Sequence, residues 1–146
     1  MKKLLSLALV LVMILALIPA AHADLVDTAL KMLVKQSNEA TGENGTYSYV
    51  RHGNLIIYKF VGSYFDELYD MAKEDEDMKE FYDSLAEALA EEQANVQAAL
   101  DGYSSVVFID CVVSARDPQV VYLAAANGEI IIDLLNGISI DRKSVV

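Results

Sequence analysis

Apolar side chains recur at helical spacing in two segments of the chain. In the first, Leu, Val and Ala residues between positions 25 and 34 form one stripe, and Asp24 before them can cap a helix N-terminus. We therefore expect a helix from residue 24 to about residue 37. The sequence NEATGENG over residues 38–45 predicts a loop after it.

The second helical segment spans residues 64–100, which contain no glycine or proline and are rich in Ala, Leu, Glu and Lys. Its apolar stripe lapses over five charged residues, 73–77 (KEDED). As one rod the segment would be about 55 Å long at 1.5 Å per residue, which is long for a domain of this size. The pattern predicts a break or kink near residues 74–77 and a helix end at Gly102.

The other segments are rich in β-branched and aromatic residues, which favour strands. Residues 46–51 and 54–60 flank His52-Gly53 and predict a β-hairpin. A three-stranded antiparallel meander is expected at the C-terminal end, over residues 104–114, 119–126 and 129–135, with Asn127-Gly128 as a hairpin turn and an ambiguous tail over 138–146. The expected fold class is therefore α+β, in two layers, with the helices packed on one antiparallel sheet.

The strands alternate poorly between apolar and polar positions, although an antiparallel sheet with one wet face should alternate. Residues 106–113 and 119–126 are apolar on both faces. We expect the long helix to cover one face and the N-terminal helix to cover part of the other; if it does not, self-association should. The alternative is that small residues such as those at 124–126 leave a tolerable exposed surface.

The first 23 residues have the order of a secretory signal peptide. Two lysines precede an apolar run over residues 4–18, and Ala21-His22-Ala23 is a small-x-small cleavage signature. The rival interpretation is an uncleaved membrane anchor, but spanning the hydrocarbon needs about 20 apolar residues and this run is shorter. We expect cleavage after Ala23, export of residues 24–146 as one secreted domain, and no stable membrane insertion afterwards.

Charge excludes one class of partner. Removal of the signal segment would leave 9 basic against 22 acidic residues, a formal net charge of −13. So acidic a chain repels phosphate backbones, and no basic patch with interleaved aromatic residues is visible, so nucleic-acid binding is excluded. An anionic membrane surface is disfavoured for the same reason.

The cysteine and histidine residues are too few for a disulfide or a zinc site. Cys111 is the only cysteine, so no intramolecular disulfide can form, and a secretion signal with a single thiol favours a bacterial source. After cleavage His52 would be the only histidine, so neither a histidine cluster nor a structural zinc set can be built. A Cys111–His52 nucleophilic pair is formally possible, but Cys111 falls within a strand and His52 within a turn. We expect no cofactor, no metal and no catalytic residue.

The acidic residues are candidate metal ligands or catalytic groups. Residues 73–77 lack the glycine and the closing glutamate of a calcium-binding loop, so we interpret them as a solvated helix face with a junction. Asp110 and Asp133 sit in hydrophobic strands and could mark a site. The preferred interpretation is that each lies at a strand end or faces a backbone partner.

Tyrosines form the candidate interaction surface. Tyr47 and Tyr49 point the same way on one predicted strand, and Tyr58 lies across the predicted turn. Tyr47, Tyr49 and Tyr122 are the candidate contact residues for a carbohydrate or peptide, although packing within the core or across strands is the preferred interpretation of the tyrosines.

Gly53 to Phe60 (GNLIIYKF), the acidic helix from Phe65 to Leu100 and the Asn127-Gly128 hairpin together resemble a family of small exported Firmicutes-type bacterial domains of unknown function. The similarity covers most of residues 24–146. It implies an α+β fold and a secreted, non-enzymatic role, and it carries no catalytic residues to transfer.

Three functional hypotheses follow. The first is a secreted binding or structural domain, with a protein partner or a homodimer formed through an apolar sheet face. The second is an inhibitor or modulator of an extracellular enzyme. The third, ranked last, is an extracellular hydrolase using carboxylates. A deep pocket with converging acids would favour the hydrolase, whereas an exposed apolar edge or loop cluster would favour the binding domain.

Overall fold

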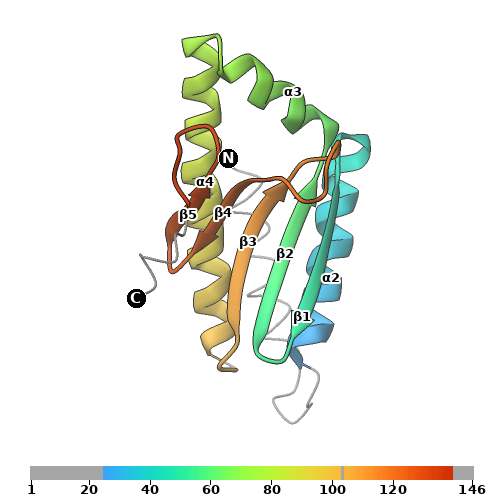
Figure 1. Ribbon diagram of the computed structural model, residues 1–146. Coiled ribbons are helices and arrows are strands. Elements are labelled where there is room, and N and C mark those ends of the chain that lie inside the picture. Colours follow the sequence, from blue (N-terminus) through green and yellow to red (C-terminus); the bar gives the residue numbers. More distant parts are fainter. Residues whose placement is uncertain (1–24, 103, 140–146) are drawn as a thin grey trace.

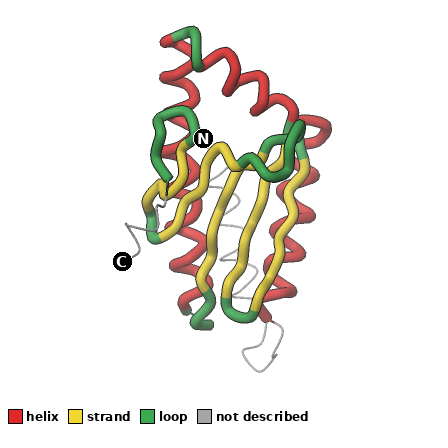
Figure 2. Tube along the Cα trace, viewed as in Figure 1, coloured by secondary structure: helices red, strands yellow, loops and turns green. Residues whose placement is uncertain are grey.

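The chain folds as helices packed on a sheet, as shown by a computed structural model that describes residues 25–102 and 104–139 (Figures 1 and 2). The expected signal peptide, residues 1–23, lies outside the described residues. The elements are, in chain order, α2 (Leu25–Thr41), the 3-10 turn η1 (Gly42–Asn44), β1 (Thr46–His52), β2 (Leu55–Val61), α3 (Ser63–Ala72), α4 (Glu76–Asp101), β3 (Val107–Val113), β4 (Val121–Ala126) and β5 (Glu129–Asp133). The α+β class expected from the sequence is confirmed.

One five-stranded sheet holds all the described strands in the order β1-β2-β3-β4-β5. The expectation of a wholly antiparallel sheet is wrong, because β2 and β3 pair in parallel, with Leu55 beside Val107 and Val61 beside Val113. The other pairings are antiparallel. A parallel neighbour requires a long crossover connection, and α3 with α4 supplies it between β2 and β3.

The break predicted within the long helical segment is confirmed. α3 ends at Ala72, and α4 begins after Asp75, whose side chain accepts hydrogen bonds from the backbone N–H groups of Asp77 (2.8 Å) and Met78 (3.4 Å). This is an N-cap, which satisfies helix donors that otherwise lack partners. The acidic stretch therefore starts a new helix.

α2 is longer than predicted, because Asn38 is helical and binds the neighbouring strand. Its side-chain oxygen accepts from the Tyr47 backbone N–H (2.6 Å), and its amide nitrogen donates to the Tyr47 carbonyl (3.1 Å). The helix continues to Thr41, and Gly42 follows with a φ of 63°, a left-handed conformation that glycine adopts without strain.

α2 and α4 pack on the same face of the sheet. One core cluster joins α2 residues such as Leu30 to Val96 of α4 through Ile56 and Phe108 of the sheet. A second cluster joins α3 and α4 to β3 and β4 around Tyr82 and Leu123. In Figure 1 the strands lie in front of α2 and α4. The expectation that the N-terminal helix covers part of the second face is therefore wrong.

Glutamines of α4 fix this helix on β3. The Gln93 side chain donates to the Phe108 carbonyl (2.7 Å), and the Gln97 side chain accepts from the Phe108 N–H (2.7 Å) and donates to the Val106 carbonyl (2.9 Å).

Among the helices within residues 25–102 and 104–139, none is long and apolar enough to cross a membrane.

Candidate functional site

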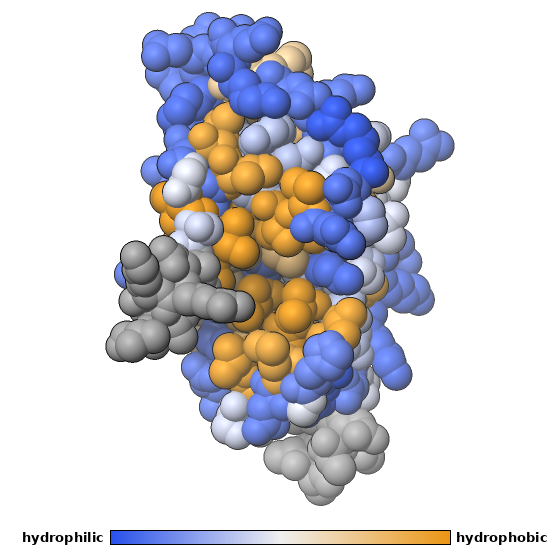
Figure 3. All heavy atoms as spheres, in the orientation of Figure 1, coloured by the Kyte–Doolittle hydropathy of each residue, from blue (hydrophilic) through white to orange (hydrophobic). Residues whose placement is uncertain are grey.

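The face of the sheet opposite the helices is apolar. Its outward positions on β3 alternate as Val107, Ile109, Cys111 and Val113. Together with residues of the neighbouring strands they form a cluster composed of Cys111, Val113 and Ala124, with Ile57, Val61, Ile109, Val121, Ile131 and Ile132 packed around them. We call this set of nine residues the outer sheet face. Figure 3 shows hydrophobic side chains gathered across the middle of this side, with hydrophilic ones around them.

The outer sheet face is short of charge in an otherwise acidic protein. On β2 the outward positions are Leu55, Ile57, Lys59 and Val61, so Lys59 is the one charged residue among the outward positions of β2 and β3. Six of the nine residues are only partly buried, and Val107 beside them is 49% exposed. Large contiguous apolar patches rimmed by polar residues mark interaction surfaces.

The three candidate tyrosines do not form a common exposed surface. Tyr47 and Tyr49 lie on the helix side of β1, where the Tyr47 ring stacks 5.3 Å from the Tyr58 ring and the Tyr49 hydroxyl donates to Asp27 of α2 (3.2 Å). Tyr122 is 2% exposed and belongs to the other core cluster. Their observed role is core and cross-strand packing, which is the preferred interpretation from the sequence.

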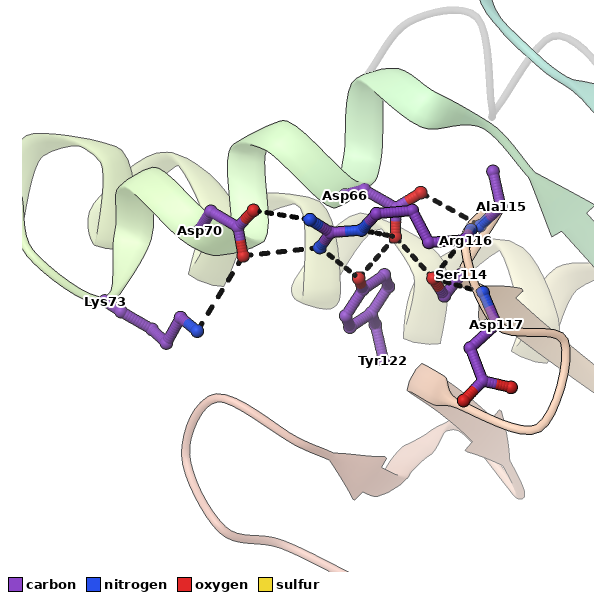
Figure 4. A network of polar contacts seen from close by, with 8 residues as sticks. All are labelled: Asp66, Asp70, Lys73, Ser114, Ala115, Arg116, Asp117 and Tyr122. Atoms are coloured by element: carbon purple, nitrogen blue, oxygen red, sulfur yellow. Dashed lines mark hydrogen bonds and ion pairs between the residues drawn. The ribbon is translucent and has the colours of Figure 1, made fainter.

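A buried carboxylate, Asp66, anchors α3 to the loop after β3 (Figure 4). It accepts hydrogen bonds from the Ser114 hydroxyl (2.6 Å), the Tyr122 hydroxyl and the Ala115 backbone N–H (2.9 Å), and Arg116 lies 3.6 Å away. Burial opposes ionisation, but these donors and the Arg116 charge outweigh it and lower the Asp66 pKa. The network lets an ionised carboxylate stay inside the fold.

Arg116 extends the same network to the surface. Its guanidinium donates to both carboxylate oxygens of Asp70 (2.8 and 3.3 Å) and to the Tyr122 hydroxyl (3.3 Å). The Ser114 hydroxyl donates to Asp66 and accepts from the backbone N–H groups of Arg116 and Asp117. These groups satisfy one another's hydrogen bonds, so we interpret them as a structural clasp. No periodic pattern in the sequence indicates it.

Two other buried acids, Glu92 and Asp110, meet no comparable set of donors among the described residues. Asp110 of β3 is 1% exposed and Glu92 of α4 is 3% exposed, and each carboxyl shifts the pKa of the other. Oδ2 of Asp110 has no donor partner among the described residues. Two neighbouring buried carboxyls disfavour ionisation of both at once. The preferred interpretation of Asp110 as a strand-end or backbone-paired residue therefore does not hold, because it lies in the middle of β3.

Burial is the main reason that this pair holds its protons. It raises the Glu92 pKa to about 7, against a smaller opposing effect of the hydrogen bond with Asp110. Burial raises the Asp110 pKa as well, and the Glu92 charge adds to the shift. The pair is at least partly protonated at neutral pH, unlike Asp66.

The acid pair lines a cavity of about 260 Å³ on the helix side of the sheet. The wall is mostly apolar and aromatic: Ala40, Thr41, Asn44, Tyr47, Phe60, Tyr64, Phe65, Leu85, Leu89, Val112 and Leu123 complete it. Asn44 and Tyr64 are exposed and mark the mouth, whereas Glu92 and Asp110 are buried and mark the base. None of the described lining residues is basic.

The remaining candidate residues, Cys111 and His52, do not form a nucleophilic pair. Cys111 is buried on the outer sheet face, where burial raises its pKa to about 12, and the Asp110 charge adds to this. His52 sits at the hairpin end, level with Val107, which is about 13 Å along the strand from Cys111. The structure does not bring the two together. A thiol so hard to ionise is a poor nucleophile.

Asp133 follows the preferred interpretation. It ends β5 and accepts from the Asn136 backbone N–H (3.1 Å) and side-chain amide (2.7 Å).

Among the described residues no group of three or more His, Cys, Asp or Glu side chains could hold a metal ion.

Comparisons with protein-family models, with curated proteins and with solved structures find no match for this chain.

Proposed function

We propose that this protein is an exported, non-enzymatic binding domain that associates with a second copy of itself through the outer sheet face. The observation that carries the proposal is that α2, α3 and α4 all pack against one face of the sheet. The apolar residues of the other face meet no described layer. Covering such a face removes apolar surface from water, which favours association.

A second copy suits this face because of its charge pattern. The chain carries a formal net charge of −11, so two copies repel one another over most of their surfaces. The outward positions of β2 and β3 carry no acidic residue and only Lys59 as a base. A two-fold interface places the same patch on both sides, and this patch offers apolar contact without opposed carboxylates.

Sedimentation equilibrium of the purified protein tests the association. A dimer that dissociates on dilution is expected, and the substitution Ile109→Lys should make it monomeric by placing two facing ammonium groups in the interface. The matched control is Met32→Lys, an exposed apolar residue on α2 that is remote from this face. It should leave the dimer intact.

A protein that stays monomeric at millimolar concentration would overturn the self-association. If such a monomer instead inhibited or bound a secreted enzyme, the alternative of an enzyme modulator would take its place. A dimer that both lysine variants preserve would move the interface to another surface.

A carboxylate-dependent hydrolase is the second candidate, because Glu92 and Asp110 converge at the base of a cavity. Glycosidases keep their two carboxyls about 5–9.5 Å apart to admit the sugar carbon or a water. Here burial raises the pKa of both groups rather than giving them separate acid and base roles, and the cavity wall is mostly apolar. We therefore rank hydrolysis second; Glu92-dependent cleavage of chromogenic glycosides, lost in Glu92→Gln, would reverse this order.

A further inference from the structure

We propose that the cavity between α2, α4 and the sheet binds a small organic amine, with the ammonium group on the Glu92–Asp110 pair and the apolar body against the aromatic wall. This site is independent of the outer sheet face, because it lies on the opposite side of the sheet.

The base of the cavity is formed by acids with no basic residue among the described residues that line it. Glu92 and Asp110 come from different elements, and both are more than nine-tenths buried. Burying carboxyls is costly unless a counter-charge or hydrogen-bond donors reach them. Asp66 shows that this fold can supply such donors, and yet Oδ2 of Asp110 has none among the described residues. A ligand that brings its own N–H donors and positive charge would complete this base.

The wall suits the rest of an amine. Tyr47, Phe60, Tyr64 and Phe65 place four aromatic rings around the cavity. Aromatic faces attract ammonium groups and provide apolar contact for a hydrocarbon body. The volume of about 260 Å³ is below the usual range of about 300–1,000 Å³ for drug-sized ligands, so the ligand must be small.

The negative net charge of the whole molecule also favours a cationic ligand. A net charge of −11 raises the local concentration of cations around the protein and repels anions. Other titratable groups that face the pair are Tyr47 of β1 and Tyr58 of β2. Burial, and after it the nearby acids, keep these phenols neutral, so they do not compete as charges.

Calorimetric titration with benzylamine and with benzyl alcohol tests the site, because the two probes share a ring and differ in the head group. At about pH 8 benzylamine should bind about tenfold more tightly than benzyl alcohol, the size expected of one charge-assisted hydrogen bond. Benzylamine affinity should fall by a similar factor towards about pH 5, because protonation of Glu92 and Asp110 removes the negative charge.

Two variants and one control separate the pair from general charge. Glu92→Gln and Asp110→Asn should each weaken benzylamine binding about tenfold and leave benzyl alcohol unchanged. Glu91→Gln removes the same charge from the adjacent, exposed position of α4 and should change neither. Circular dichroism of each variant reports whether it folds, and either folded variant suffices.

Absence of benzylamine binding to the wild-type protein, equal affinities for the two probes, or equal effects of Glu91→Gln and Glu92→Gln would overturn the amine site. None of these results bears on the dimer, and a strict monomer that binds benzylamine would retain the amine site alone.

Discussion

Asp66 and Asp110 are both buried aspartates, at 2% and 1% exposure, and they behave in opposite ways. Asp66 accepts from Ser114, Tyr122 and the Ala115 backbone and lies near Arg116, so its pKa is lowered. Asp110 faces another carboxyl, and burial raises its pKa. The difference teaches that burial alone does not decide the charge of an acid: the donors around it do.

The two regions therefore serve different purposes in this fold. The Asp66 clasp connects α3 to the β3–β4 loop with its groups mutually satisfied, which is what a structural site requires. The Glu92–Asp110 pair lies at the base of a cavity, and Oδ2 of Asp110 has no hydrogen-bond donor among the described residues. The proposed amine would supply that donor. Natural proteins accept such a local cost mainly where function needs it.

Removing the clasp's acceptor is the substitution with the largest expected effect. Asp66→Ala leaves the Ser114 and Tyr122 hydroxyls and the Ala115 N–H without their partner, which should lower the free energy of unfolding by about 3 kcal/mol or more. Urea denaturation measures it. Asp70→Ala is the control, because it also loses contact with Arg116 but is exposed, and its effect should be much smaller. Equal losses would mean that the Arg116 ion pairs matter more than the buried hydrogen bonds.

The pH dependence of stability tests the pair of carboxyls. The unfolded chain releases the Glu92 proton near the ordinary value of 4.5, whereas the folded chain holds it to about pH 7. The folded state thus binds more protons in this window, so stability should fall as pH rises from about 5 to about 8, by about 3 kcal/mol from Glu92, and the raised pKa of Asp110 acts in the same direction. Urea denaturation across this range should show the slope in the wild type and in Glu91→Gln.

Glu92→Gln should reduce that slope, because the amide does not titrate and only Asp110 of the pair still does. Below about pH 4 the sign reverses: the lowered pKa of Asp66 contributes stability that is lost as the carboxylate is protonated. A wild-type stability that rises between about pH 5 and about pH 8 would contradict the protonated pair.

Removing a single donor from the clasp is expected to have the smallest effect. Tyr122→Phe deletes one hydroxyl that donates to Asp66 while Ser114 and Ala115 remain, so a loss of about 1 kcal/mol is expected in urea denaturation. The Asp66 pKa, followed by carboxyl NMR, should rise towards its ordinary value. Tyr64→Phe, at an exposed ring, is the control. An unchanged Asp66 pKa would show that the other donors already suffice.

Local signals predicted local structure well. The five charged residues at 73–77 interrupt an apolar stripe, and the chain breaks its helix there and caps the next one with Asp75. Asn127-Gly128 forms the expected tight turn, with φ of 55° and 75°. Such features depend on a few neighbouring residues, so a single sequence suffices to read them.

Pairings between distant segments were less predictable. The parallel alignment of β2 with β3 depends on where α3 and α4 deliver the chain, about 50 residues later, and no local pattern encodes it. The cavity likewise draws its walls from helices and strands far apart in the sequence. For Asp110 the one available signal was an acid within a hydrophobic strand.

The sequence by itself determined the α+β class, the helix junction, the hairpins and the presence of apolar residues on both faces of the strands, because these follow from composition and spacing. Only the tertiary structure decided that the helices share one face, which buried aspartate meets donors, and which meets another acid. Those outcomes depend on which side chains from distant segments come into contact, and burial changes their energies according to the partners they find.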